Sequence, residues 1–283
     1  MKSVFFELLK AAAIKRFHSV LFILSLARLQ INHRTMPLQE ELESQGNFLF
    51  KYRGILPLLI LVIGLSVLIV EVQADPFAWE YQEFTPLKWT SFAVCIFGLL
   101  IRMYTVGHTP KHTSGRNTKE QVADVLNSTG IYSTVRHPLY VGNFFMWLGV
   151  GMLTGNVWFL VAFTFVYWVY YERIMFAEEQ FLRKKFGKAY IDWAGDTPAF
   201  WPSFSKFKKA AVPFSWPKVI KKEKNGILAT FICFWLFEIV AQSVIEGELA
   251  YQFDFWFYAT VASSVVYLII KFLRKNTQVL AEK

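Results

Sequence analysis

The sequence Gly130-Ile-Tyr132-Ser-Thr-Val-Arg136-His137-Pro138-Leu-Tyr140-Val-Gly142 runs directly into the apolar stretch 143–153. This turn contains an arginine, a histidine and two tyrosines, all side chains that can contact a ligand. Proline fits the first turn of a helix and disfavours helix before it, so Pro138 predicts that a helix begins there. The stretch therefore predicts an apolar helix with ligand-contacting groups at its start. The alternative is that His137 only caps this helix.

The composition is typical of a membrane protein. The 283 residues are 54% hydrophobic and 18% charged, with a mean hydropathy of +0.34, which is more apolar than a soluble protein of this size. Cys95 and Cys233 both lie in apolar runs, which argues against a disulfide framework or a cysteine-based metal site. Pro110 lies between His108 and His112 and disfavours a shared helical face, so we predict no metal site.

Six apolar segments predict an all-α, polytopic membrane protein with about six transmembrane helices. The segments are residues 55–72, 89–106, 139–153, 157–175, 227–245 and 255–273. Each is close to the ~17–25 residues that cross a bilayer, except the third, which spans only ~22 Å.

The third and fourth segments are joined by only Thr154-Gly155-Asn156. Such a short connection predicts an antiparallel helical hairpin. Both outer ends of the hairpin then return to the same membrane face. This brings the His137 turn close to Glu178 and Glu179, which follow the fourth segment.

Lysine and arginine fall almost entirely on one side when the segments are threaded alternately from an inside N-terminus. The inside pieces hold 8 basic residues in 1–53, 4 in 107–138, 11 in 176–226 and 4 in the tail from Lys271, whereas the outside loops hold only Lys88. This positive-inside pattern indicates that the net charge of +9 faces anionic lipid and not nucleic acid. We expect an integral protein of the bacterial inner membrane, or of the endoplasmic reticulum in a eukaryote, with its site on the cytosolic side.

The chain divides into four regions. Residues 1–53 form a basic N-terminal region, whose residues 1–29 predict an amphipathic helix on the membrane surface or a helix packed on the rest of the protein. Residues 54–202 contain every recognisable motif. A lysine-rich linker, 203–226, and a C-terminal helix pair, 227–283, complete the chain.

A second motif, Glu178-Glu179-Gln-Phe-Leu182, is followed by Phe186-Gly187-Lys-Ala-Tyr190 and by the closing Thr197-Pro198-Ala-Phe-Trp-Pro202. The order of an R-H-P-x-Y-x-G turn, a membrane hairpin, E-E-x-x-L, F-G-x-x-Y and a terminal proline motif resembles the isoprenylcysteine carboxyl methyltransferase and phospholipid methyltransferase group. The resemblance covers residues 98–202. It implies an integral-membrane methyltransferase that uses S-adenosyl-L-methionine, because in these families the two motifs together enclose that cofactor.

The resemblance implies cofactor contacts at five residues: Tyr132, His137, Tyr140, Glu178 and Glu179. Carboxylates suit the ammonium group or the ribose of the cofactor, and aromatic faces suit its adenine and its sulfonium. From the sequence alone, the two glutamates could instead form a solvated helix face that pairs with the basic residues after them.

Arg136 and Arg173 are the catalytic candidates on the substrate side. Related enzymes place an arginine near Arg173 to hold an anionic acceptor, though often one residue nearer the glutamates; an arginine at a membrane boundary can also merely snorkel. Residues 107–129 interleave basic side chains, hydroxyl groups and a glycine, as an anion-binding nest does. We therefore predict substrate contacts at Arg116 and Lys119. Asn143 is a further predicted substrate contact. A cytosolic loop without a ligand is the alternative for this segment.

The acceptor follows from the chemistry of methyl transfer. A carboxylate or phosphate oxygen is anionic at neutral pH and needs alignment and desolvation, whereas an amine needs a general base. No isolated membrane-facing base other than His137 or the glutamate pair stands out, so we expect O-methylation of an anionic group of a lipid or lipidated substrate.

Two other functions remain as alternatives. Membrane reductases of the sterol or steroid type, which use NADPH, share a similar R-H-P-x-Y turn, but here Leu139 follows the proline and no Arg-Asp pair precedes the glutamates. A non-catalytic transporter or scaffold is disfavoured because the apolar segments hold few polar residues, Glu238 and Gln242 being the main exceptions.

Overall fold

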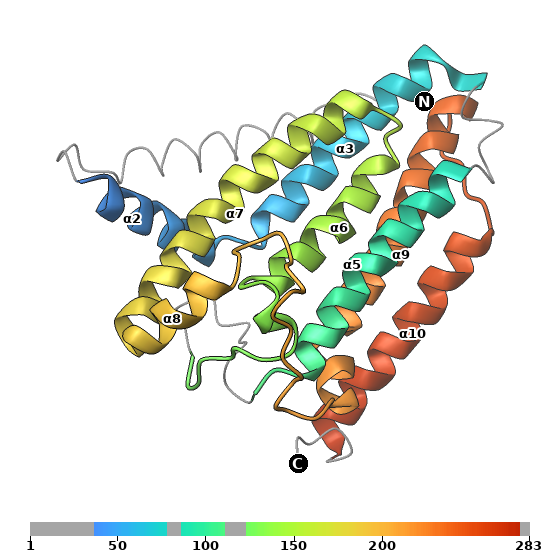
Figure 1. Cartoon of the computed structure of the whole chain (residues 1–283). Coiled ribbons are helices and arrows are strands. Elements are labelled where there is room, and N and C mark those ends of the chain that lie inside the picture. Colours follow the sequence, from blue (N-terminus) through green and yellow to red (C-terminus); the bar gives the residue numbers. More distant parts are fainter. Residues whose placement is uncertain (1–36, 78–85, 111–122, 278–283) are drawn as a thin grey trace.

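The computed structural model describes residues 37–77, 86–110 and 123–277. Within these ranges the chain is helical and contains no β-strand, which confirms the predicted all-α fold. Figure 1 shows the long helices side by side in a bundle, with α2 against one end of α7 and α10 at the opposite edge. The helices are α2 (Leu38–Lys51), α3 (Ile55–Ala74), α5 (Pro86–Gly107), η1 (Ile131–Ser133), α6 (Pro138–Met152), α7 (Val157–Phe186), α8 (Lys188–Asp196), α9 (Trp216–Glu246) and α10 (Phe255–Asn276).

Five of these helices are long and apolar enough to cross a membrane: α3, α5, α7, α9 and α10, with 20, 22, 30, 31 and 22 residues. Large apolar side chains on them point outward, such as Phe165 (69% exposed) and Leu268 (59% exposed), and form a surface suited to lipid. The remaining apolar segment is α6, whose 15 residues pack between α5 and α7. The polytopic membrane architecture is therefore confirmed, with a third helix shorter than a full span.

The hairpin of α6 and α7 forms as predicted. Gly155 turns the chain with a φ of 67°, a left-handed value that glycine adopts without strain. Asn156 then caps α7, because its side chain accepts a hydrogen bond from the backbone N–H of Phe159 at 2.7 Å. Further along, the Tyr167 hydroxyl donates to the backbone carbonyl of Tyr140 at 2.7 Å and ties the two helices together.

Two helices extend further than hydropathy predicts. α7 continues past residue 175 to Phe186, so both glutamates of the second motif lie on the membrane helix itself. α9 begins at Trp216, so the second half of the predicted linker 203–226 is helical. Pro217 suits the first helical turn and lysine is a good helix former, which explains why this segment is helical. The hydropathy pattern did not predict this helix because its lysines are polar.

The surface helix predicted for residues 1–29 lies outside the described residues. In the adjoining stretch, α2 packs closely on α7 at Gly46, where a Cβ atom would lie 2.1 Å from the backbone carbonyl oxygen of Arg173. An ion pair between Glu43 and Lys184 (2.6 Å) joins the same two helices.

The packing of α6 on α5 depends on glycine. A Cβ atom on Gly98 would lie 2.4 Å from the carbonyl oxygen of Gly142, and one on Gly149 would lie 2.4 Å from that of Ser91. Both distances are shorter than any van der Waals contact, so the two backbones approach each other only because these positions lack side chains. Small residues serve this purpose where membrane helices meet.

We expect Gly98→Ala to lower the free energy of unfolding by about 1–3 kcal/mol, because the added methyl group forces α5 away from α6. The measurement is thermal unfolding in detergent. Gly195→Ala, in α8, is the matched control, since no atom lies within 4 Å of its added Cβ. Equal midpoints for the two variants would contradict the close approach of α5 and α6.

Candidate functional site

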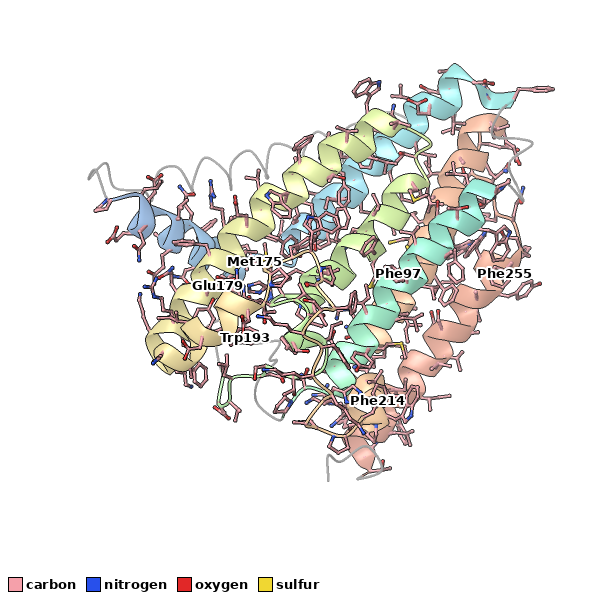
Figure 2. All side chains as sticks on the ribbon, in the orientation of Figure 1. Phe97, Met175, Glu179, Trp193, Phe214 and Phe255 are labelled. Atoms are coloured by element: carbon pink, nitrogen blue, oxygen red, sulfur yellow. The ribbon has the colours of Figure 1, made fainter. Side chains whose placement is uncertain are left out.

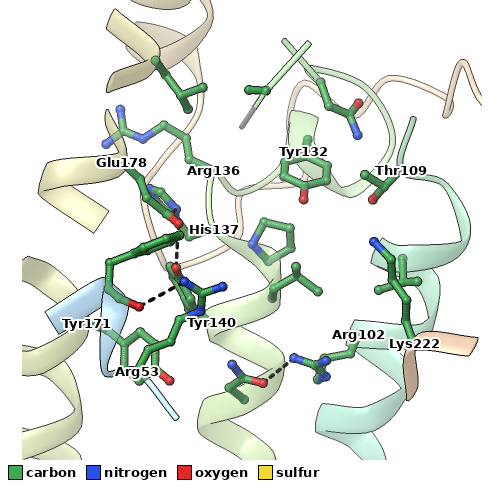
Figure 3. Close-up of a pocket in the computed structure, with 18 of the residues that line it drawn as sticks. Arg53, Arg102, Thr109, Tyr132, Arg136, His137, Tyr140, Tyr171, Glu178 and Lys222 are labelled. Atoms are coloured by element: carbon green, nitrogen blue, oxygen red, sulfur yellow. Dashed lines mark hydrogen bonds and ion pairs between the residues drawn. The ribbon is translucent and has the colours of Figure 1, made fainter. Parts of the chain in front are cut away.

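A cavity of about 420 Å³ lies at the end of the bundle where α3, α6 and α9 begin and α5 ends. Its size is within the range of small-molecule sites, roughly 300–1,000 Å³. Figure 3 shows polar and aromatic side chains from α5, α6, α7 and α9 facing it, together with Arg53 from just before α3. Four of the five predicted cofactor contacts line it: Tyr132, His137, Tyr140 and Glu178.

His137 lies between the two glutamates of α7. Its Nε2 is 2.9 Å from Glu179 Oε1, and its Nδ1 is 3.5 Å from Glu178 Oε2. The Tyr140 hydroxyl donates a hydrogen bond to Glu178 Oε1 at 2.8 Å, and the Tyr140 ring stacks on His137 with centroids 5.7 Å apart. The two motifs that the hairpin was predicted to bring together therefore meet in one hydrogen-bonded cluster.

The electrostatic setting of His137 favours its charged form. The ring is only 7% exposed, and burial by itself disfavours the charge, but hydrogen bonds to Glu178 and Glu179 and their negative charges outweigh burial and raise the pKa of His137. For Tyr132, burial raises the pKa to about 12, with a smaller opposing effect from a hydrogen bond to Thr109. The surroundings of His137 thus favour retention of its ring proton, while the Tyr132 phenol is neutral near neutral pH.

Glu178 and Glu179 have different surroundings, although they are adjacent in sequence. Glu179 Oε1 also contacts Arg136 Nε at 3.0 Å, and Arg136 is held in turn by the backbone carbonyl of Ala194 at 3.0 Å. Figure 2 shows Glu179 on α7 and Trp193 on α8, the helix that follows it in the chain. Glu179 therefore holds Arg136 and His137 in place, while Glu178 and Arg136 face the cavity.

The structure does not bring Arg173 to the cavity. Its guanidinium lies 3.1 Å from the neighbouring Glu172 on the outside of α7. At ~100° per residue, Arg173 is turned by about 140° from Glu178, so one straight helix cannot present both to the same site. The spacing of five residues on one helix already indicates that Arg173 and Glu178 face different directions. We therefore remove Arg173 from the candidate site. The predicted contacts Arg116 and Lys119 lie outside the described residues.

Asn143 lines the cavity, and it belongs to a polar group that the sequence analysis missed. Arg102 of α5 donates from Nη1 to Asn143 Oδ1, and its Nε and Nη2 pair with the two carboxylate oxygens of Glu223 of α9 at 2.9 and 2.8 Å. The Glu223 side chain is 1% exposed and that of Arg102 is 21% exposed. An arginine inside an apolar segment was the available signal, because such a charge needs a partner.

Comparison with known proteins agrees with the motifs. The phospholipid methyltransferase family model matches residues 88–189. The chain is 34% identical over 123 residues to the nickel-cobalt-cadmium resistance protein NccN of Alcaligenes xylosoxydans xylosoxydans, covering 42% of this chain and 55% of the relative. It is 38% identical over 93 residues to the protein-S-isoprenylcysteine O-methyltransferase of Saccharomyces cerevisiae, covering 33% of this chain and 38% of the relative.

A probable protein-S-isoprenylcysteine O-methyltransferase of Oryza sativa subsp. japonica is 31% identical over 119 residues, covering 41% of this chain and 61% of the relative. The chain thus spans between 38% and 61% of the length of these three relatives. No solved structure matches the chain. The predicted resemblance to the isoprenylcysteine and phospholipid methyltransferase group is confirmed for the region that carries the two motifs.

The raised pKa of His137 predicts a pH-dependent stability. The stabilisation from its charged form is fully present below the pKa of an unfolded histidine, about 6.5, and is lost as the pH rises through the higher pKa of the folded state. We expect the thermal midpoint of the wild type, relative to that of His137→Gln, to fall as the pH rises above about 6.5.

The control is the same substitution in a Glu178→Gln, Glu179→Gln background, where no carboxylate remains to favour the charged ring. There the difference between histidine and glutamine should not fall in this way. Parallel pH profiles for the wild type and His137→Gln would contradict a charged His137.

Proposed function

We propose that this protein is a membrane methyltransferase that uses S-adenosyl-L-methionine and O-methylates an anionic group, a carboxylate or a phosphate, of a lipid or lipidated substrate. The observation that carries this proposal is the cavity in which Glu178, held by His137 and Tyr140, faces aromatic side chains at one end of a membrane bundle. The match to the phospholipid methyltransferase family over residues 88–189 supports it.

The side chains around the cavity fit this cofactor. Glu178 offers a carboxylate for its ammonium group, and Arg136 offers donors for its carboxylate. The rings of Tyr132, Tyr140 and Trp193 line the same cavity and suit an adenine ring or a sulfonium cation. Glu179 and His137 keep Arg136 and Glu178 oriented, as their contacts at 3.0 and 3.5 Å indicate.

Methyl transfer to an anionic oxygen requires no proton transfer by the protein. When bound, S-adenosylmethionine would supply the methyl group for a C–O bond to the acceptor, and the electrons of the broken C–S bond would remain on sulfur. The protein has to align the acceptor and exclude water. Both ring nitrogens of His137 face carboxylates, Nδ1 toward Glu178 and Nε2 toward Glu179, so neither is directed at an amine acceptor, and this favours an acceptor that is already anionic.

The shape of the bundle favours an acceptor that enters from the lipid. α6 is about 22 Å long at 1.5 Å per residue, less than the ~30 Å of a hydrocarbon core, and it begins at the cavity. The cavity also lies at the end of the bundle that the positive-inside pattern assigns to the cytosol. We therefore propose that the site is cytosolic, in the bacterial inner membrane or in the endoplasmic reticulum of a eukaryote.

Isothermal titration calorimetry in detergent tests this function. The purified protein should bind S-adenosylmethionine and S-adenosylhomocysteine and should not bind NADPH. Glu178→Gln should weaken binding of S-adenosylmethionine by roughly 10- to 150-fold, which corresponds to the ~1.5–3 kcal/mol of a charge-assisted contact.

Glu172→Gln is the matched control, since Glu172 lies on the same helix but is 50% exposed and pairs with Arg173 outside the cavity. Its affinity should equal that of the wild type. Binding of NADPH without any response to the two adenosyl compounds would assign the protein to the reductases.

A further inference from the structure

The cavity has two walls of different character. One wall comes from α6 and α7 and carries the cofactor candidates His137, Tyr140 and Glu178. The opposite wall comes from the end of α5 and the start of α9, with Arg102, Lys222 and Glu223. Figure 3 shows Arg102 and Lys222 on the side away from Glu178 and His137. Because α9 begins at Trp216, this wall includes a helix beyond the residues 88–189 that match the family.

The Arg102–Glu223 pair gives the second wall a defined geometry. Both carboxylate oxygens of Glu223 accept from the guanidinium, at 2.9 and 2.8 Å, and this two-point contact fixes the plane of Arg102. The remaining terminal nitrogen, Nη1, donates to Asn143 Oδ1. The amide oxygen of Asn143 is thereby engaged, which leaves its NH₂ group as the donor that can serve the cavity and the adjacent Tyr171.

The described residues that line the cavity carry a net positive charge. Four cationic residues line it, Arg53, Arg102, Arg136 and Lys222, against the two anionic residues Glu178 and Glu223. Oriented amide and guanidinium donors in a positive environment suit an anionic oxygen. The cofactor candidates His137, Tyr140 and Glu178 do not belong to the wall that holds Lys222 and Arg102.

We propose that the α5–α9 wall is the acceptor subsite, in which Lys222 and the Asn143 amide bind an anionic head group and Glu223 positions Arg102 for this purpose. This inference rests on the proposed function, and it gives the start of α9 a part in selecting the substrate. A carboxylate and a phosphate share the chemistry that the wall recognises.

Binding of two lipid probes tests the proposal: a farnesylated cysteine with a free carboxylate, and phosphatidic acid. Each is titrated in detergent against the protein saturated with S-adenosylhomocysteine. At least one probe should bind, and Lys222→Gln should weaken its binding by about tenfold, as expected for one lost charge-assisted contact. The probe that binds identifies the source of the anionic group.

Lys221→Gln is the matched control, because it makes the same change of charge on the same helix at a residue that does not line the cavity. It should bind both probes like the wild type. Equal effects of the two lysine substitutions, or no binding of either probe to protein that holds S-adenosylhomocysteine, would overturn the subsite and leave the cofactor assignment intact. Failure to bind S-adenosylhomocysteine would instead overturn the proposed function.

A second comparison separates positioning from structural support. Lys88 and Glu238 form another buried ion pair between α5 and α9, at 2.7 Å, away from this cavity. We expect Arg102→Gln with Glu223→Gln to weaken probe binding about tenfold while S-adenosylhomocysteine binds as in the wild type. Lys88→Gln with Glu238→Gln should leave probe binding unchanged, even if both double variants melt at lower temperature. Equal losses of probe affinity would show that the Arg102–Glu223 pair only holds the helices together.

Discussion

The antiparallel register of α6 and α7 is the constraint on which the site depends. The short turn around Gly155 returns α7 to the end of the bundle where α6 begins, and this places Glu178 and Glu179 on either side of His137. Charged groups taken out of water are costly unless they pair closely. A shift of one residue along α7 would rotate each carboxylate by ~100°, so the cluster itself keeps the two helices in this register.

Close backbone contacts at glycines and ion pairs between side chains hold the rest of the bundle against this hairpin. Gly98 and Gly149 let α5 lie directly on α6, which brings Arg102 within reach of Asn143. Arg102 in turn engages Glu223 and draws the start of α9 to the same cavity. Packing therefore decides which polar groups meet, and the ion pairs then fix their orientation.

Adjacent residues take different roles in this arrangement because a helix separates them by ~100°. Glu178 faces the cavity, whereas Glu179 turns toward Arg136 and His137 and orients them. The same geometry excludes Arg173, which shares the helix but pairs with Glu172 on its outer side. Of these two adjacent carboxylates, one therefore lines the cavity and the other holds its neighbours.

The sequence by itself determined the all-α membrane fold, the hairpin and the meeting of the His137 turn with the glutamates. These follow from hydropathy, from the length of one turn and from the side on which helix ends must lie, all of which are local properties. Only the tertiary structure decided that Glu223, within a segment that looked like a basic linker, pairs with Arg102 more than a hundred residues earlier. The physical reason is that contacts between helices depend on their rotation and separation, which close packing at positions such as Gly98 sets and which no spacing along the chain encodes.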